Sequence, residues 1–95
     1  MNFESYKIVI IIPAYRVERN IEQVLHGLPD YIKHIIVVDD ASPDSTADLV
    51  TARCASDSRL ILIRHVQNQG VGGAMISGFK KALELGAQIV VKIDG

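Results

Sequence analysis

The stretch Ile35-Ile36-Val37-Val38-Asp39-Asp40-Ala41-Ser42 decides the fold, because it joins four branched aliphatic residues to two adjacent carboxylates. The aliphatic run does not alternate with polar residues, which is typical of a strand buried on both faces of a parallel sheet. Such sheets bind ligands outside the carboxyl ends of their strands. The two acids therefore either begin the next turn and helix, or they belong to a binding site.

Three further segments have the same aliphatic character and are predicted to be strands: Lys7–Pro13, Arg59–His65 and Gln88–Ile93. The first of them ends at a proline, which cannot donate a hydrogen bond to a sheet ladder. All four strands are expected to lie in one sheet.

The segments between the strands carry apolar residues at helical spacing. A first helix is predicted from Ile21 to Leu28, and a second begins at Ser42–Ser45, where a capping serine precedes a proline and an acid, and runs to Cys54. The glycine-rich connection Val66–Gly73 leads into a third helix, Ala74–Leu85. The order β-α-β-α-β-α-β predicts an α/β fold, a Rossmann-like three-layer α/β/α arrangement with a mainly parallel sheet.

Composition places the chain among ordinary globular proteins and predicts one domain over residues 1–95. Of its residues 48% are hydrophobic and 22% charged, and the net charge of −1 disfavours nucleic acid as a partner, since phosphate binding needs a basic surface. The single cysteine, Cys54, excludes an internal disulfide and is expected to be buried in the second helix. Residues 1–7 lack the features of a secretory signal, so a cytoplasmic location is expected.

The residues that follow the strands would gather at one edge of this sheet. They are Pro13-Ala14-Tyr15, Asp39-Asp40, the connection that begins at His65, and Asp94. A carboxylate can accept hydrogen bonds from a base or a ribose, and Tyr15 offers a ring for stacking. Asp94 is a hard oxygen ligand suited to Mg²⁺ or Mn²⁺. This clustering predicts a nucleotide site.

Single residues also have simpler interpretations. Tyr15 can equally be a half-buried aromatic at the rim of the sheet. His65 is expected to be a loop or surface histidine, and the sequence assigns no partner carboxylate to it. The glycines of the connection either approach a phosphate or let the third helix pack closely on the sheet.

Several motifs in order resemble the N-terminal half of family 2 glycosyltransferases, the nucleotide-sugar-dependent enzymes of the GT-A fold. They are the Ile-Pro-Ala-Tyr turn, the run Val-Val-Asp-Asp-Ala-Ser-Pro-Asp-Ser-Thr, the pattern Asn68-x-Gly70-x-Gly72 before a helix, and a strand that ends at Asp94. The pattern is most similar to polyprenol-phosphate sugar transferases and to bacterial enzymes of cell-surface polysaccharide synthesis. The resemblance extends from Lys7 to Gly95 and makes the chain a truncated GT-A domain.

The resemblance implies transfer of a sugar from a UDP- or GDP-linked donor to an acceptor such as a polyprenyl phosphate or a growing polysaccharide. It assigns nucleotide-sugar binding to Pro13, Ala14, Tyr15, Val38, Asp40, Asp94 and Gly95. Asp40 would accept a hydrogen bond from the base, while Asp39 supports the turn. Asp94 would be the first acid of an Asp-x-Asp motif that holds Mg²⁺ or Mn²⁺ against the diphosphate, with Gly95 as its middle residue.

The chain departs from the family pattern in two places. Members commonly have Asn-Glu after the tyrosine, where this chain has Arg16 and Val17, and Glu18 is the nearest substitute for that glutamate. The chain also ends before the second acid of the Asp-x-Asp motif. It is therefore expected to be the donor-binding half of a longer enzyme acting at the cytoplasmic face of a membrane, with no catalytic residue and no activity of its own.

Parts of the sequence also suggest three other functions. The Val-Val-Asp-Asp run also begins receiver-type signalling domains, in which Asp94 would be phosphorylated beside Mg²⁺, but that interpretation leaves the first β-α unit unexplained. A dinucleotide oxidoreductase is excluded, because the turn after the first strand, residues 13–20, contains no glycine. A non-catalytic nucleotide-binding fragment, or one that self-associates through the open edge of its last strand, stays possible.

Overall fold

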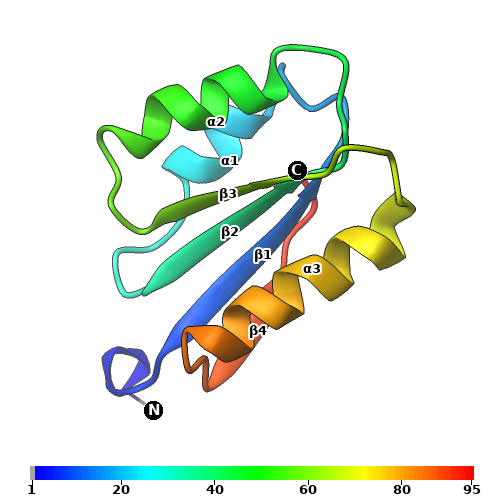
Figure 1. The fold of residues 1–95 in the computed structure, drawn as a ribbon. Coiled ribbons are helices and arrows are strands. Elements are labelled where there is room, and N and C mark those ends of the chain that lie inside the picture. Colours follow the sequence, from blue (N-terminus) through cyan, green and yellow to red (C-terminus); the bar gives the residue numbers. More distant parts are fainter. Residues whose placement is uncertain (1) are drawn as a thin grey trace.

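The computed structural model describes residues 2–95, so Met1 lies outside the described part of the predicted domain. Figure 1 shows a sheet between two layers of helices. The elements in chain order are the 3₁₀ turn η1 (Phe3–Ser5), β1 (Ile8–Ala14), α1 (Ile21–His26), β2 (His34–Asp39), α2 (Thr46–Cys54), β3 (Leu60–Arg64), α3 (Gly70–Glu84) and β4 (Ile89–Lys92). The predicted α/β class and three-layer arrangement are confirmed.

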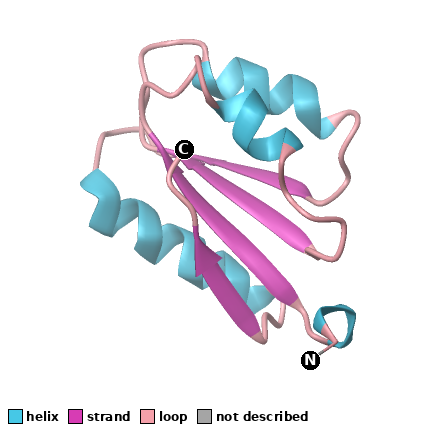
Figure 2. Cartoon of the chain, turned by 180° about the vertical axis from the view of Figure 1, so that it is seen from behind, coloured by secondary structure: helices cyan, strands magenta, loops and turns pink. Residues whose placement is uncertain are grey.

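The four strands form one parallel sheet in the order β3-β2-β1-β4. Along the chain, β2 and β3 follow on one side of β1, and β4 lies on the other side of β1. The strand order therefore reverses between β1 and β4, and such a reversal leaves a crevice at the carboxyl ends of the two strands. α3 covers one face of the sheet, and α1 and α2 cover the other (Figures 1 and 2).

Alternate residues of β1 supply the two halves of the core. Ile10 and Ile12 face the layer of α1 and α2, where they pack with Ile21 and Val50. The residues between them face α3 instead, and this second cluster contains Val9, Ile11, Ile36, Val38, Ala74 and Ala82. Both faces of the strand are thus buried, as the unbroken aliphatic runs predict.

A stripe of small residues lets α3 lie close to the sheet. Ala74, Gly78 and Ala82 recur every fourth residue and are the buried residues of this helix. A Cβ atom on Gly78 would lie 2.5 Å from Cγ2 of Ile11, so the helix backbone occupies space that a larger residue would need. This glycine serves helix–sheet packing.

Two predicted helix starts and the burial of Cys54 are corrected by the structure. Residues 42–45 form a turn, and α2 begins only at Thr46. α3 begins at Gly70, so the second half of the predicted connection is the first turn of this helix. Cys54 is half-buried at the end of α2, with its Sγ 3.8 Å from the carbonyl oxygen of Leu60.

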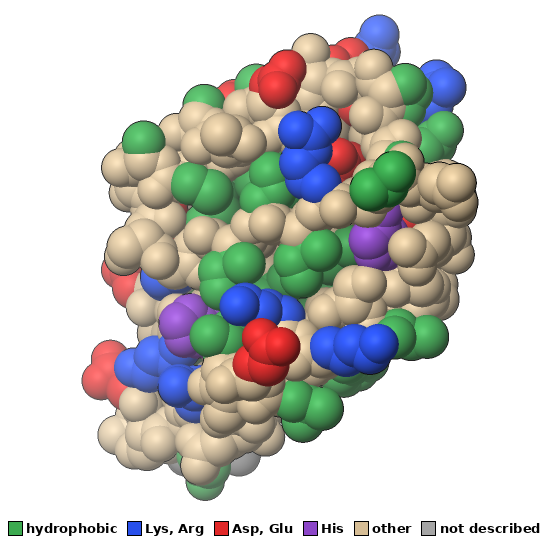
Figure 3. Space-filling model, in the orientation of Figure 1, with side chains coloured by type: hydrophobic (Ala, Val, Ile, Leu, Met, Phe, Trp, Pro, Cys, Tyr) green, Lys and Arg blue, Asp and Glu red, His purple; other side chains and the backbone are tan. Residues whose placement is uncertain are grey.

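The surface carries charges of both signs. On the face that Figure 3 shows, basic and acidic side chains are interspersed with apolar ones, which agrees with the net charge of −1. Among residues 2–95, no helix is both long and apolar enough to cross a lipid bilayer.

Candidate functional site

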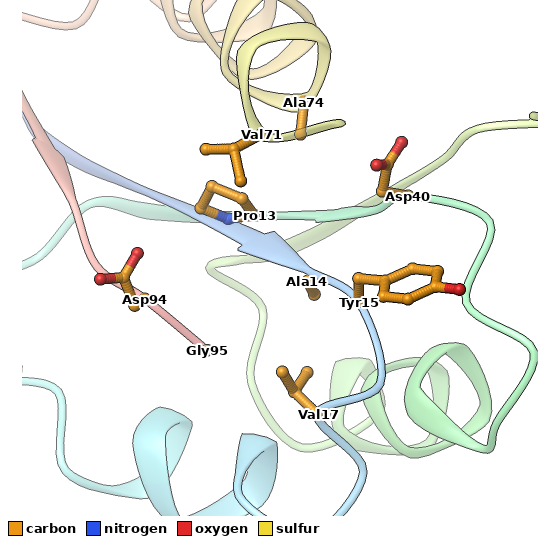
Figure 4. A pocket seen from close by; sticks show the side chains of 9 residues that line it. All are labelled: Pro13, Ala14, Tyr15, Val17, Asp40, Val71, Ala74, Asp94 and Gly95. Carbon is orange, nitrogen blue, oxygen red and sulfur yellow. The ribbon is translucent and has the colours of Figure 1, made fainter. Parts of the chain in front are cut away.

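A cavity of about 190 Å³ lies at the carboxyl edge of the sheet, where the strand order reverses between β1 and β4 (Figure 4). The residues that line it are Pro13, Ala14, Tyr15, Val17, Asp40, Val71, Ala74, Asp94 and Gly95. Six of the seven predicted site residues are therefore brought together. The exception is Val38, which has no exposed surface and packs in the cluster beneath α3, so its side chain cannot contact a ligand.

Tyr15 lines the pocket, and Arg16 contacts its ring. The Tyr15 ring is 44% exposed, and the Arg16 guanidinium lies 5.5 Å from its centroid, within the range of a cation–π contact. Arg16 has a φ of 55°, and its backbone N–H donates to Oγ of Ser42 at 2.8 Å. The ring is thus available as a stacking surface on a turn that the neighbouring loop supports.

Val17 and Glu18 join this turn to the start of α2. The backbone N–H of Val17 donates to Oγ1 of Thr46 at 3.1 Å. Oε2 of Glu18 accepts a 2.9 Å hydrogen bond from the backbone N–H of Ser45, so Glu18 holds the turn before α2 and does not line the pocket. In this structure Glu18 is therefore not among the residues that line the pocket. Val17 lines the pocket instead.

Asp44 organises the same turn. Its carboxylate accepts hydrogen bonds from the Ser42 and Thr46 hydroxyls and from the Thr46 and Glu18 backbones. Burial raises the pKa of Asp44, but these hydrogen bonds outweigh it and lower the pKa to about 2. The charged form of this acid is thus part of the folded turn.

Asp40 is a buried carboxylate in the wall of the pocket, 4% exposed. Its Oδ1 accepts a hydrogen bond from the backbone N–H of Gln69 and its Oδ2 one from that of Gly70, both at 2.8 Å. Burial alone raises the pKa of Asp40, but the hydrogen bonds from His65, Gln69 and Gly70 outweigh it, so the pKa is lowered. Asp40 therefore caps α3 from the neighbouring strand, a role that sequence reasoning missed.

The sequence interpretation also placed His65 wrongly, because the structure shows it buried and paired with a carboxylate. Its side chain is only 6% exposed, and its Nδ1 lies 2.8 Å from Oδ1 of Asp40. Its Nε2 lies 2.7 Å from Oγ of Ser77 on α3. The pairing register could have revealed this partner, because β2 and β3 are parallel with Asp39 opposite Arg64, so the next two residues are neighbours.

Asp39 has the supporting role predicted for it. It is 1% exposed, and its Oδ1 accepts a 3.1 Å hydrogen bond from the backbone N–H of Ser42. Its Oδ2 lies 3.6 Å from Nε of Arg64. The acid pair is therefore divided: Asp39 lies outside the pocket lining, and Asp40 is part of it.

Asp94 lies across the pocket from Asp40 (Figure 4). Its side chain is 88% exposed, and its contact with a charged group is with Nζ of Lys92 at 3.4 Å. Residues 2–95 contain no cluster of three or more His, Cys, Asp or Glu side chains that could hold a metal ion. The donor available to a cation at this end of the pocket is thus the single carboxylate of Asp94.

The family model for glycosyl transferase family 2 matches residues 9–91. The chain is 40% identical to the UDP-N-acetylglucosamine–dolichyl-phosphate N-acetylglucosaminyltransferase of Methanococcus voltae, over 92% of the chain and 40% of that protein. It is 36% identical to the undecaprenyl-phosphate mannosyltransferase of Micrococcus luteus, over 93% of the chain and 37% of that protein. The chain thus spans about two fifths of the length of these relatives.

Solved structures show the same fold. The mannosyltransferase PcManGT from Pyrobaculum calidifontis, in complex with GDP-Man and Mn²⁺, superposes with a TM-score of 0.74 and 25% identity, over 83% of the chain and 26% of that structure. S. aureus TarS 1–349 has a TM-score of 0.75 and 25% identity, over 93% and 27%. The GT-A expectation is confirmed, and nothing in these likenesses favours a receiver domain. The chain belongs to glycosyl transferase family 2.

Proposed function

We propose that this chain binds the nucleotide part of a nucleotide-diphosphate sugar, and that the whole protein transfers the sugar to a polyprenyl phosphate or a growing polysaccharide. One observation carries the proposal: an aromatic ring, a buried carboxylate and an exposed carboxylate line one pocket at the point where the strand order reverses. The names of the two curated relatives, both sugar transferases to a lipid phosphate, support it. Because such an acceptor is linked to a membrane, the proposed reaction takes place at a membrane surface, and we propose that this is the cytoplasmic face.

The three groups suit different parts of such a donor. The exposed ring of Tyr15 can stack on a base, with Pro13 and Ala14 shaping the wall beside it. The Asp40 carboxylate can accept a hydrogen bond from a base N–H. Val38 contributes from beneath, because it is buried near the end of β2, the strand that leads directly into Asp40.

Asp94 and Gly95 lie where the diphosphate would reach the end of β4. Mg²⁺ in nucleotide sites is commonly held by one or two carboxylates together with substrate phosphates, so the lone carboxylate of Asp94 fits such a role for Mg²⁺ or Mn²⁺. The PcManGT complex, which contains both GDP-Man and Mn²⁺, agrees with this pairing of donor and cation. When bound, the cation would neutralise charge that develops on the leaving diphosphate.

Calorimetric titration of the chain with UDP, GDP and their sugars, with and without Mn²⁺, tests the proposal. We expect binding that Mn²⁺ strengthens, a loss of affinity in Tyr15→Ala, and a loss of the Mn²⁺ effect in Asp94→Asn. Asp48→Asn, which changes an exposed acid of α2 away from the pocket, is the matched control. A folded chain that binds none of these nucleotides would overturn the proposal.

We also expect the 95-residue chain to bind the donor without transferring the sugar. The buried pocket acid, Asp40, already accepts hydrogen bonds from the chain itself, which leaves it poorly suited to remove a proton from an acceptor. A radiolabelled sugar-transfer assay with a polyprenyl phosphate checks this expectation. Transfer above the level of a Tyr15→Ala control would contradict it.

Self-association is a second possibility, which a specific surface favours. β4 pairs only with β1 among residues 2–95, and beside it lies an apolar cavity of about 250 Å³ lined by Tyr31, Ile89, Val91 and other apolar residues. Open strand edges and exposed apolar surface promote pairing between chains. Light scattering after size-exclusion chromatography measures the mass, and a monomer at micromolar concentration counts against this alternative.

A further inference from the structure

A continuous set of hydrogen bonds connects the pocket to the middle of α3 through a histidine. Asp40 directly follows β2, His65 directly follows β3, and Ser77 lies on α3. The two contacts between them measure 2.8 and 2.7 Å. The Asp40 and His65 side chains are each 6% exposed, so water does not compete freely for these contacts. We refer to these residues as the 40–65–77 triad.

The protonation of the triad follows from the acceptor at one end. The Asp40 carboxylate is ionised at neutral pH, because its hydrogen bonds lower its pKa, and a carboxylate only accepts. Nδ1 of His65 must therefore carry the proton that it donates to Oδ1. In the neutral ring Nε2 is then an acceptor, and the Ser77 hydroxyl donates to it. The three residues thus fix one another's orientation.

The contacts also limit what Asp40 can offer a ligand. A carboxylate has about four lone-pair sites, two on each oxygen. Oδ1 accepts from His65 and from the Gln69 backbone, which occupies both of its sites. Oδ2 accepts from the Gly70 backbone, so one site on Oδ2 is unused by these three bonds. His65 is the side-chain donor on Oδ1, and it fixes how the carboxylate is turned together with the two backbone donors.

We propose that His65 is a positioning residue for the nucleotide pocket, which holds the Asp40 carboxylate so that the remaining site on Oδ2 serves the ligand. The consequence for ligand binding rests on the proposed function. Ser77 completes the arrangement, because it lies one residue before Gly78, where an added Cβ atom would lie 2.5 Å from Cγ2 of Ile11. The acceptor in the pocket and the packing of α3 on β1 are thereby linked.

A nucleophilic role for Ser77 is disfavoured although the atoms follow the order of a hydrolase triad. In such enzymes the serine stands beside free backbone N–H groups that stabilise the oxyanion. Ser77 is the eighth residue of α3, Gly70–Glu84, beyond the first turn, and N–H groups at that depth are bonded within the helix. The geometry holds a carboxylate in place and offers no site for an oxyanion.

Nuclear magnetic resonance of the ¹⁵N-labelled chain tests the positioning without any ligand. We expect His65 to show the tautomer protonated at Nδ1, and the amides of Gln69 and Gly70 to exchange slowly with solvent. In His65→Phe these two amides should exchange faster while the amides of β1 keep their protection. A neutral His65 protonated at Nε2, or unchanged exchange in His65→Phe, would overturn the proposal.

Nucleotide titrations of matched variants test the consequence for binding. His65→Asn places an amide N–H near the position of Nδ1, so it keeps the donor to Asp40, whereas His65→Phe removes it. We expect His65→Phe to weaken nucleotide binding by roughly tenfold, and His65→Asn and Ser77→Ala to remain within roughly threefold of the original chain. His26→Phe, on the exposed face of α1, controls for the change of ring.

The outcomes separate the two proposals. Wild-type affinity in a folded His65→Phe chain overturns the role of His65 and leaves the nucleotide site standing. Absence of nucleotide binding by the unaltered chain overturns the proposed function, and the tautomer and exchange measurements still decide whether His65 orients Asp40. If His65→Phe does not fold, two other measurements decide: the tautomer of His65, and the nucleotide affinities of His65→Asn and Ser77→Ala. Equal tenfold losses of affinity in these two variants would count against the proposal. Labelling of Ser77 by a fluorophosphonate probe would restore the nucleophilic role and overturn the positioning one.

Discussion

Asp40 and Asp94 line the same pocket from opposite sides, and the chain holds them in opposite ways (Figure 4). The side chain of Asp40 is 6% exposed and accepts hydrogen bonds from His65, Gln69 and Gly70. The side chain of Asp94 is 88% exposed and, within residues 2–95, has a single ionic contact, with Lys92. The first acid is fixed before any ligand arrives, and the second is free to move.

This difference matches two kinds of recognition. A base presents its hydrogen-bonding groups in a rigid plane, so an acceptor that reads them gains from being fixed in advance. A hydrated cation and a diphosphate adjust to each other, and a mobile carboxylate can follow them. We call the side of the pocket with Asp40, after β2, the held side, and the side with Asp94, after β4, the free side. The following substitutions test the contrast between them.

The largest difference is expected between Asp40→Ala and Asp94→Ala. Removing Asp40 leaves two backbone N–H groups and a buried histidine without their acceptor, which should lower the free energy of unfolding by about 3 kcal/mol. Removing Asp94 breaks one exposed ion pair and should change it by less than about 0.5 kcal/mol. Urea denaturation followed by circular dichroism measures both, and similar losses would remove the distinction between the two sides.

A second test displaces α3, the helix whose first residue, Gly70, donates a hydrogen bond to Asp40. Gly78→Ala places a methyl group 2.5 Å from the fully buried Ile11, and the resulting shift of α3 should cost about 1–3 kcal/mol of stability. Gly72→Ala is the matched control, because a Cβ there meets nothing within 4 Å and alanine favours the helix by about 0.5–1 kcal/mol. The same denaturation experiment compares them, and a stabilised Gly78→Ala chain would show that α3 can be displaced freely.

The elements of the sheet were predictable from sequence because each strand is an unbroken aliphatic run. Pro13, Asp40 and Asp94 follow such runs, and parallel strands bring the residues after them to one edge, so the pocket could be predicted from the same pattern. The start of α3 could not be predicted, because its cap is not a neighbouring residue in the sequence. Asp40 provides it from 29 and 30 residues away.

Side-chain direction explains why three other side chains could not be placed from the sequence. Glu18 lies next to a pocket residue in the chain, but it points to Ser45, because the turn at Arg16 adopts a positive φ that redirects the backbone. Val38 precedes Asp39 and Asp40, yet alternation along the strand turns its side chain beneath α3. The contact between His65 and Asp40 follows from the register of β2 and β3, and neither segment of sequence alone reveals that register.

A third test uses acid, since two of the carboxylates beside the pocket have lowered pKa values. For Asp44 the pKa falls from 3.8 to about 2, so its contribution to stability is complete above pH 3.8 and disappears as the pH falls towards 2. Asp40 acts in the same direction. Unfolding should become easier across this range, as measured by urea midpoints at successive pH values. Asp44→Asn should flatten the profile, and an unaltered slope would argue against an ionised acid in this turn.

The smallest effect concerns the strained residue that follows the held acid. Ala41 has a φ of 60°, a left-handed conformation in which the Cβ atom crowds the following carbonyl oxygen, and glycine has no such penalty. Ala41→Gly should therefore stabilise the chain by up to about 1 kcal/mol. Ala55 provides the matched control, because its φ is −67° and glycine there only adds freedom to the unfolded chain. The two substitutions should change the urea midpoint in opposite directions. If both lower it, the left-handed turn after Asp40 carries no strain, and its shape follows from the hydrogen bonds of Asp39 and Ser42 alone.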